Sequence, residues 1–281
     1  MTSETISLTQ ALAQAQAQGL PRIDAQLLLL HALARPEAGR AWLLAHDTDP
    51  LPPEAHARFA ALCQRRQAGE PVAYLTGRKE FYGLPLQVDA RVLDPRPDTE
   101  TLVDWALTLA QPLPAPRIVD LGTGSGAIAL ALQHHCPHAR VLAIDASEDA
   151  LAVARANAAQ LNLPIGVAHG HWLAGAAQGP FDLIVSNPPY IRASDPHLAA
   201  LAHEPLEALA SGEDGLQDIR TIVAQAPAHL VRGGWLLLEH GHDQASDVAA
   251  LLRESGFVQV QSRNDLAGIL RCTGGQWPTV K

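Results

Sequence analysis

The sequence has few cysteines and no long apolar run, and both shortages exclude classes of protein. Its three cysteines, Cys63, Cys136 and Cys272, lie far apart without C-x-x-C spacing, which argues against a disulfide framework and a zinc site. The longest apolar runs, such as Leu27 to Leu30, fall far short of a membrane span. Met1 to Thr9 carries no Lys or Arg and precedes no signal-type apolar core. We therefore expect a cytoplasmic protein with no membrane partner and no bound metal ion.

Basic residues are also in short supply. Lys and Arg number 20 against 29 Asp and Glu, which gives a net charge of −9 at pH 7. Such an acidic total disfavours salt-driven binding to a phosphate backbone, so direct contact with nucleic acid is not expected. The 281 residues, 47% of them hydrophobic, exceed the usual size of one domain and can bury a core without disulfides. We expect two domains.

The first part of the chain has the pattern of short helices. From Leu8 to about Gly69 it is rich in Ala, Leu, Gln and Arg, with apolar residues at helical spacing. Ser7 is placed to cap a first helix. A second helix is predicted from Asp24 to Ala34, and another from Pro53 to Ala68. Each is too short to be stable alone, so we predict a small all-helical domain over residues 1–80.

The pattern changes after this region. Leu84, Leu86 and Val88 alternate with other residues before Arg91 to Leu93, which is typical of a β-hairpin. We predict that residues 81–95 form a hairpin connector between the two domains.

Strands and helices then alternate over residues 96–281. This order predicts an α/β fold of the Rossmann-like kind, with a mostly parallel sheet, helices on both faces and an antiparallel strand near the C-terminal end. The predicted strands are Arg117 to Leu121, Val141 to Asp145, Phe181 to Ser186, Gly234 to Glu239, Val258 to Asn264 and Ile269 to Thr273. The predicted helices begin near Glu100, Ala127, Ala150, Gly215 and Asp243.

A glycine-rich run, Asp120-Leu121-Gly122-Thr123-Gly124-Ser125-Gly126, follows the first of these strands and precedes an Ala/Leu-rich helix. Glycines at the carboxyl end of a parallel strand let the backbone approach a nucleotide closely, although a tight structural turn has the same composition. The spacing is Gly-x-Gly-x-Gly rather than the Gly-x-Gly-x-x-Gly of dinucleotide enzymes. The candidate cofactor contacts here are Gly122, Thr123, Gly124, Ser125 and Gly126.

Asp145 ends the next strand, about 20 residues beyond the glycines. An acidic residue in this place accepts hydrogen bonds from both hydroxyls of a bound ribose. Alternatively, Asp145 caps the helix that follows it. The glycine-rich turn and Asp145 together favour a nucleoside-binding site.

The most specific motif is Asn187-Pro188-Pro189-Tyr190, which follows a buried strand. The two prolines remove backbone donors, so the turn offers acceptors, namely the Asn187 side-chain oxygen and main-chain carbonyls, to an incoming NH2 group. Tyr190 offers a flat face for a planar amide or base. We predict Asn187 and Tyr190 as catalytic residues and the whole motif as the substrate site; a rigid turn with a packed tyrosine is the alternative.

With these motifs the chain resembles the HemK/PrmC-type protein-glutamine methyltransferases that modify bacterial peptide-chain release factors. The resemblance spans nearly the whole chain. It implies a class I methyltransferase domain that uses S-adenosyl-L-methionine, yields S-adenosyl-L-homocysteine and methylates the glutamine of a Gly-Gly-Gln motif. It also implies that Asp145, Trp172 and Asn187 contact the cofactor, with Trp172 beside the adenine, and that the helical domain recognises the protein substrate. We expect a monomer. The segments that carry the resemblance are residues 71–77, 95–100, 120–131, 186–190, 204–206 and 236–241.

Two places depart from the pattern of this family. Asp94 stands where an apolar residue is expected, before Pro95. The C-terminal Gly274-Gly275-Gln276 spells the tripeptide that the family methylates, so self-methylation is an alternative that requires this tail to reach Tyr190.

Other readings of the motifs stay open at this point. Residues 96–100 separate the chain from relatives that methylate a glutamine of a large-subunit ribosomal protein. An amino-methyltransferase acting on a nucleic-acid base would suit the same motif, because both substrates present a planar nitrogen. A nicotinamide-dependent oxidoreductase is a further alternative, which cofactor binding would distinguish. A non-enzymatic nucleotide-binding module is another, but it would leave Asn187 to Tyr190 without a role. His134 to His138 lacks a second ligand cluster at metal-binding spacing, so we expect a solvated loop there.

Overall fold

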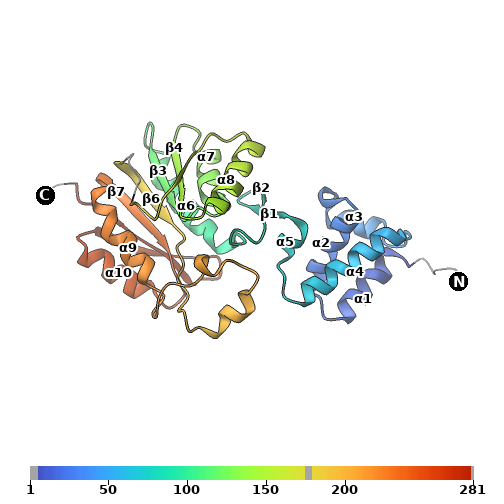
Figure 1. Cartoon of the computed structure of the whole chain (residues 1–281). Coiled ribbons are helices and arrows are strands. Elements are labelled where there is room, and N and C mark those ends of the chain that lie inside the picture. The colour runs from blue at the N-terminus through green and yellow to red at the C-terminus, as the bar shows by residue number, and fades with distance from the viewer. Residues whose placement is uncertain (1–5, 175–178, 280–281) are drawn as a thin grey trace. The chain divides into compact units, whose positions relative to one another are not determined.

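The computed structural model describes residues 6–174 and 179–279 (Figure 1). The chain divides into two compact units, Met1–Arg78 and Lys79–Lys281. No helix within the described ranges is long and apolar enough to cross a membrane.

The first unit is helical, as predicted. The Ser7 hydroxyl accepts from the Gln10 backbone N–H at 3.2 Å and the Gln10 side chain accepts from the Ser7 N–H at 2.8 Å, which confirms the cap of the first helix. The second helix begins at Arg22 rather than Asp24, and Asp24 instead pairs with Arg66 at 2.8 Å. The helices of this first unit are α1 Leu8–Ala17, α2 Arg22–Ala32, α3 Gly39–Ala45, α4 Pro53–Gln67 and α5 Val72–Thr76, with a 3-10 turn at Pro36–Ala38.

The second unit is built on a seven-stranded sheet in the order β5-β4-β3-β6-β7-β9-β8. The first five strands are parallel, whereas β9 runs antiparallel to β7 and β8 antiparallel to β9, which confirms the predicted α/β sheet. The chain order reverses between β3 and β6, and such a switch point is where open α/β sheets bind ligands. The strands are β3 Arg117–Leu121, β4 Arg140–Asp145, β5 Gly166–His169, β6 Phe181–Ser186, β7 Leu230–Glu239, β8 Val258–Asn264 and β9 Leu270–Gln276.

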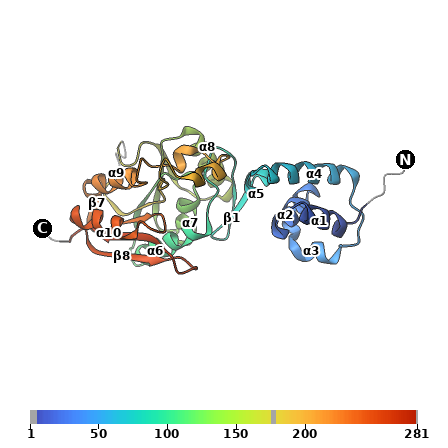
Figure 2. The ribbon, with the colours of Figure 1, turned by 90° about the horizontal axis from the view of Figure 1, so that it is seen from below.

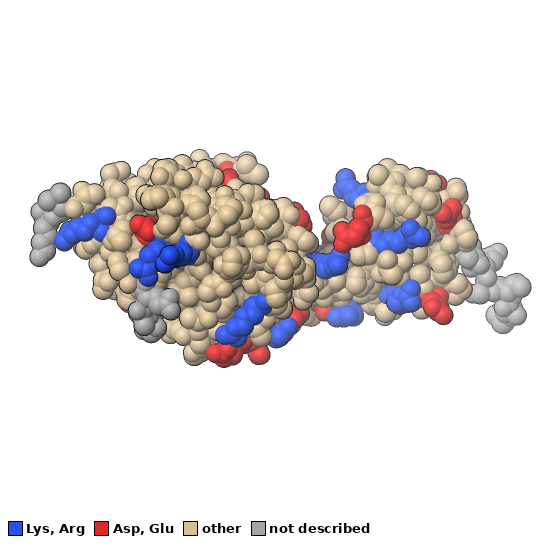
Figure 3. Space-filling view, turned by 90° about the horizontal axis from the view of Figure 1, so that it is seen from above, with Lys and Arg blue, Asp and Glu red and all other residues tan. Residues whose placement is uncertain are grey.

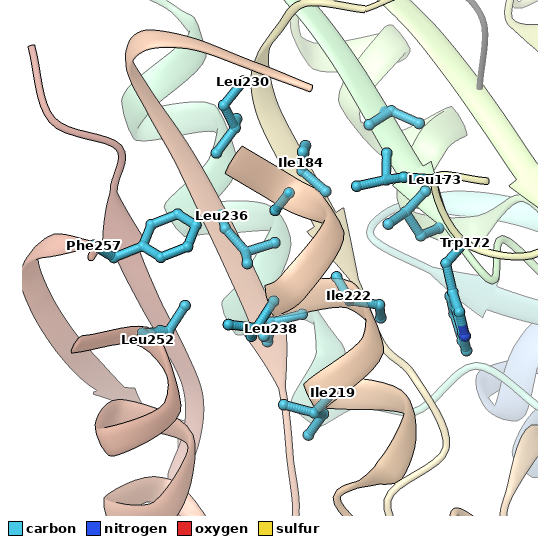
Figure 4. Packing of buried hydrophobic residues seen from close by; sticks show 14 of the residues in the cluster. Trp172, Leu173, Ile184, Ile219, Ile222, Leu230, Leu236, Leu238, Leu252 and Phe257 are labelled. Carbon is cyan, nitrogen blue, oxygen red and sulfur yellow. The ribbon is translucent and has the colours of Figure 1, made fainter. Parts of the chain in front are cut away.

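Helices cover both faces of this sheet (Figures 1 and 2). On the face of α9 and α10, Ile184 of β6, Leu236 of β7 and Ile222 of α9 are fully buried in one apolar cluster (Figure 4). Burying each such side chain contributes about 1.5 to 3 kcal/mol, so this cluster holds the strand ends in place. The helices are α6 Glu100–Ala110, α7 Ala127–His135, α8 Glu148–Leu161, α9 Gln217–Gln225 and α10 Ala245–Glu254, with 3-10 turns at Pro97–Thr99, Pro196–Leu201, Leu206–Ala208 and Ala226–Ala228.

The connecting hairpin differs from its prediction. Its strands are β1 Arg78–Phe81 and β2 Leu84–Gln87, and residues 91–93 lie in no strand. The turn is Tyr82-Gly83, with φ of 51° and 78°, the left-handed geometry that two-residue hairpins prefer. The predicted strand at 84 is therefore right, but its partner precedes it in the chain instead of following it.

The C-terminal tripeptide lies inside the sheet and is no free tail. Strand β9 continues to Gln276, and Gly274 pairs with Leu237 of β7. Gly274 and Gly275 are buried, and the Gln276 side chain donates to the Gly233 carbonyl at 2.9 Å. A glutamine held this way does not reach Tyr190 without pulling β9 out from between β7 and β8, so the self-methylation hypothesis is wrong.

Candidate active site

The glycine-rich turn joins β3 to α7 at the switch point of the sheet. Gly122, Gly124 and Gly126 have φ of 68°, 55° and 84°, a region that L side chains rarely adopt. A Cβ added at Gly122 would lie 3.2 Å from the Trp172 ring, and one at Gly126 would lie 3.1 Å from Leu130. The turn therefore requires glycine both for its backbone and for the space around it.

Asp145 ties this turn to the end of β4. One of its carboxylate oxygens accepts from the Gly124 N–H at 2.8 Å, and the other accepts from the Ser147 N–H at 2.9 Å. Each oxygen keeps a second lone pair for a ligand hydroxyl. The helix cap that the sequence offered as an alternative is supplied by Ser147, whose hydroxyl accepts from the Ala150 N–H at 3.2 Å.

A cavity of about 540 Å³ opens beside the turn. That volume is ordinary for a small-molecule or cofactor site, and it suits a nucleoside with an extended tail. Its wall includes six of the predicted site residues, namely Gly122, Gly124, Asp145, Trp172, Asn187 and Pro189. The other lining residues come from 91–93, 146–150, 205–210, His171 and Asp218.

Trp172 both packs and lines the cavity. The residue has a φ of 53° and is 9% exposed, and its ring lies at the margin of the apolar cluster in Figure 4. Its indole N–H donates to the Asp218 carboxylate at 3.2 Å. This bond fixes the ring plane against Gly122, so a flat apolar face borders the cavity.

The Asn-Pro-Pro-Tyr segment follows β6. Ser186 anchors it by donating to the Leu121 carbonyl at 2.7 Å, which brings the ends of β6 and β3 together. The Asn187 amide nitrogen donates to the Thr99 hydroxyl at 3.2 Å. The Tyr190 hydroxyl donates to the Glu239 carboxylate at 3.4 Å, and burial raises the pKa of this tyrosine well above its usual range. Asn187 therefore lines the cavity while Tyr190 turns toward β7.

Five predicted site residues support the site without lining the cavity. The Thr123 hydroxyl donates to the Asp120 carboxylate at 2.6 Å, and the Ser125 carbonyl accepts from the Asn157 amide at 2.9 Å. Both contacts brace the inside of the turn. The five residues are Thr123, Ser125, Gly126, Pro188 and Tyr190.

Sequence reasoning gave no role to several polar residues that surround these groups. Thr99 and Glu239 contact Asn187 and Tyr190, and Asp218 holds Trp172. Asp120 is fully buried, and burial raises the pKa of its carboxyl to about 7. A single acidic residue inside or ending an apolar strand was the available signal for Asp120 and Glu239.

The segment before α6 is held by ion pairs to two buried carboxylates, Asp94 and Glu204. Asp94 is 6% exposed and pairs with Lys79 at 3.1 Å and with Arg96 at 3.4 Å. Arg96 also pairs with Glu204, and the Asp94 N–H donates to the same glutamate at 3.3 Å. The expected apolar residue is thus replaced by an ion-pair network that links residues 94–96 to the loop carrying residues 205–210.

Histidines lie outside the cavity wall apart from His171. His138 contacts the Leu113 carbonyl at 3.0 Å, and His240 contacts the Thr273 hydroxyl at 2.8 Å. Among residues 6–174 and 179–279, no group of three or more His, Cys, Asp or Glu side chains is arranged to hold a metal ion.

Two family models match the chain. One, described as Methyltransferase small domain, matches residues 100–265, and the other, PrmC N-terminal domain, matches residues 7–77. A protein of Bordetella pertussis named release factor glutamine methyltransferase is 51% identical over 92% of this chain and 95% of its own length. A protein of the same name from Xylella fastidiosa is 47% identical over 95% of this chain and 98% of its own length.

Solved structures share the fold at low identity. The hMettl16 catalytic domain in complex with MAT2A 3′UTR hairpin 1 is 18% identical, with a TM-score of 0.58 and 81% of each chain covered. The T. thermophilus 16S rRNA N2 G1207 methyltransferase, solved with AdoMet and guanosine, is also 18% identical, with a TM-score of 0.55 over 71% of this chain and 49% of that one. These likenesses confirm the Rossmann-like methyltransferase fold. On the identity and coverage of its relatives, this chain belongs to the release factor glutamine methyltransferases.

Proposed function

We propose that this chain transfers a methyl group from S-adenosylmethionine to the side-chain amide nitrogen of the glutamine in the Gly-Gly-Gln motif of peptide-chain release factors, leaving S-adenosylhomocysteine. The observation that carries the proposal is the position of Asn187 and Pro189 on the wall of the same cavity as Gly122, Gly124 and Asp145. Family membership supports it, since the relatives that cover nearly the whole chain carry the name of this activity.

The cavity wall suits the proposed cofactor. Gly122 and Gly124 keep side chains out of the space next to the backbone, and Asp145 has free lone pairs for two ribose hydroxyls. The ring of Trp172 provides a flat surface for a base. We propose that these residues hold the nucleoside, with the reacting end directed toward Asn187.

The chemistry requires a poor nucleophile to be oriented. An amide nitrogen shares its lone pair with its carbonyl, so hydrogen bonds that accept its protons increase the electron density on nitrogen. The Asn187 oxygen and the carbonyls of the proline segment are acceptors of this kind. When bound, the cofactor supplies an electrophilic methyl group, and Asn187 aims the nitrogen in line with it. The amide proton leaves after attack, so no strong base is required.

We also propose that different parts of the chain have different roles. Residues 96–281 carry out the reaction, residues 81–95 connect the two domains, and residues 1–80 recognise the release factor. Three large apolar side chains of the helical unit, Ile23, Leu27 and Leu44, are 43% to 65% exposed, which suits contact with a protein. We further propose that the enzyme acts as a monomer in the cytoplasm, where its substrate takes part in translation.

Two other substrates would fit the same motif. Methylation of a ribosomal-protein glutamine uses the same chemistry, but the relatives at high identity are named for release factors. Methylation of a nucleic-acid base would be favoured by a continuous basic surface. On the face shown in Figure 3, Lys and Arg are instead interspersed with Asp and Glu and separated by broad uncharged areas.

A competition assay tests the choice of substrate. The full chain is incubated with labelled S-adenosylmethionine and equal amounts of a release factor, the large-subunit ribosomal protein and a structured RNA. The proposal predicts label on the release factor. Label on the ribosomal protein alone, or on the RNA alone, would replace the proposal with the corresponding alternative.

A further inference from the structure

Glu239 is a buried carboxyl group without an assigned role. It is the last residue of β7 and is 1% exposed. Its Oε1 accepts from the Tyr190 hydroxyl at 3.4 Å, and hydrogen bonding by the Thr99 hydroxyl lowers the pKa of this carboxyl. Its Oε2 has no hydrogen-bond partner within the part of the chain that the structure describes. A buried, partly satisfied carboxylate destabilises a fold relative to an apolar side chain, so this position calls for a functional explanation.

The protons of this cluster can be counted. Thr99 has one hydroxyl proton, which it donates to Glu239 when that carboxyl is ionised. Toward Asn187 the same hydroxyl can then only accept, and the Asn187 amide nitrogen lies 3.2 Å from it. Because the oxygen and nitrogen of an amide point in opposite directions, Oδ1 of Asn187 is directed away from Thr99. Asn187 therefore keeps an acceptor available on the cavity wall.

Protonation of Glu239 would reverse this order. A protonated Glu239 carboxyl donates to the Thr99 hydroxyl, which then donates to Asn187. The Asn187 amide would rotate by about 180° so that its oxygen accepts this hydrogen bond, and its NH2 group would then take the place of the oxygen on the cavity wall. A substrate NH2 would then meet a donor rather than an acceptor, and it would lose the hydrogen bond that orients it.

We propose that ionised Glu239 is a positioning residue that fixes the amide orientation of Asn187 through the Thr99 hydroxyl. The proposal rests on the proposed function, since this orientation matters because Asn187 receives an NH2 group. Glu239 does not line the cavity, so it acts through Thr99 and Asn187.

The surroundings of Glu239 come from three segments. Burial has the largest effect and raises the pKa of Glu239 to about 7. The Thr99 hydrogen bond and Arg271 of β9 lower this pKa, Asp98 raises it, and the Tyr190 hydrogen bond lowers it. Cys272, paired with Glu239 across the sheet, has a pKa raised by burial and stays a thiol. The carboxyl thus titrates near neutral pH.

The first test is Glu239→Gln, which keeps the size of the side chain and removes its charge. We expect kcat for release-factor methylation to fall about 10- to 100-fold. This loss is no larger than the loss expected when a group that contacts the substrate directly is removed. The affinity for S-adenosylhomocysteine should stay within about twofold, because the variant leaves the cavity wall intact. Glu254→Gln, at an exposed position on α10 of the same unit, is the matched control and should behave as the wild type.

Thermal stability distinguishes positioning from packing. Since burial raises the pKa of Glu239, its ionisation above pH 7 costs folding free energy, and Glu239→Gln removes that cost. The variant should therefore melt at the wild-type temperature or higher at pH 8 while its kcat is low. A lower melting temperature that accompanies the loss of kcat would point to packing and overturn the proposal.

A second pair of variants tests the link through Thr99. Thr99→Val removes the hydroxyl at nearly constant volume and should lower kcat as Glu239→Gln does, whereas Thr99→Ser keeps the hydroxyl and should retain most of the activity. The Glu239→Gln/Thr99→Val double variant should be no slower than the slower single variant, because both break one chain of contacts. If Glu239→Gln does not fold, Thr99→Val and Thr99→Ser still test the proposal, because equal kcat values for these two variants would overturn it.

The pH dependence supplies the remaining readout. Wild-type kcat should fall as the pH drops through about 7, and this step should be absent in Glu239→Gln. Wild-type turnover with an unchanged pH profile in Glu239→Gln refutes the positioning role alone. Absence of methyl transfer to the release factor by the wild-type chain refutes the proposed function instead.

Discussion

At the scale of single residues, the cavity beside the glycine-rich turn depends on the absence of a side chain at Gly122. Its α-carbon has a φ of 68°, and a Cβ there would lie 3.2 Å from the Trp172 ring. We predict that Gly122→Ala weakens binding of S-adenosylhomocysteine about tenfold, equivalent to about 1.4 kcal/mol, because the Trp172 ring that lines the cavity must shift. Calorimetric titration measures this. Gly268→Ala is the control, since Gly268 has a similar φ of 81° with nothing within 4 Å of the added atom. Equal binding by the two variants would contradict the prediction.

Two buried carboxyls, Asp120 and Glu239, should make the fold less stable at alkaline pH. Burial raises the pKa of each to about 7 in the folded chain, so the folded state holds these protons more tightly than the unfolded state. Their contribution to stability is complete below the ordinary carboxyl range and is lost as the pH rises through about 7. We predict that the difference in melting temperature between pH 5.5 and pH 8 is smaller by about 5 °C or more in Asp120→Asn than in the wild type. A difference as large as that of the wild type would show that Asp120 does not titrate in this range.

At the scale of elements, Trp105 of α6 packs closely on β9 because Gly274 has no side chain. A Cβ at this position would lie 2.5 Å from the Leu237 side chain and 2.9 Å from the Trp105 ring. Overpacking of this kind costs about 1 to 3 kcal/mol. We therefore predict that Gly274→Ala lowers the free energy of unfolding by that amount, measured by urea titration. Unchanged stability would mean that β9 is not held at the position described.

The strands that position the site could be predicted because they are mostly apolar and a turn-forming residue ends or follows each one. Strand β3 is followed by Gly122, β4 ends at Asp145, and β6 is followed by Asn187 and two prolines. The sequence failed where the strand is exposed or short: β1 consists largely of exposed charged residues, and the edge strand β5 has four residues. Their pairing depends on neighbours that periodicity does not reveal.

Within the site, too, some residues could be predicted from the sequence and others could not. Gly122, Asp145 and Asn187 follow strands directly, so their gathering at one edge of a parallel sheet could be inferred from their positions in the chain. Thr99 and Glu239 are distant from Asn187 in sequence, and their contacts with its segment arise from the packing of a 3-10 turn and of β7 against β6. Hydrogen bonds of this kind leave no pattern in the sequence.

At the scale of the whole molecule, the two compact units allow the roles proposed for them, substrate recognition and chemistry, to be tested separately. The cavity lies entirely in Lys79–Lys281, and the model named PrmC N-terminal domain matches residues 7–77. We predict that a chain shortened to residues 79–281 binds S-adenosylhomocysteine as the full chain does but methylates release factor with a kcat/KM lowered about 100-fold, because it lacks the surface that recognises the protein. Full kcat/KM in the shortened chain would remove the helical unit from substrate recognition.

The most direct measurement is methyl transfer to a purified release factor by the wild-type chain and by Asn187→Ala, followed by peptide mass mapping. At saturating S-adenosylmethionine the wild type should place one methyl group on the Gly-Gly-Gln glutamine. The variant should be slower by about 100-fold or more, with its affinity for S-adenosylhomocysteine reduced far less, because Asn187 orients the nitrogen that reacts. A methyl group at another position, or wild-type turnover in Asn187→Ala, would contradict the account.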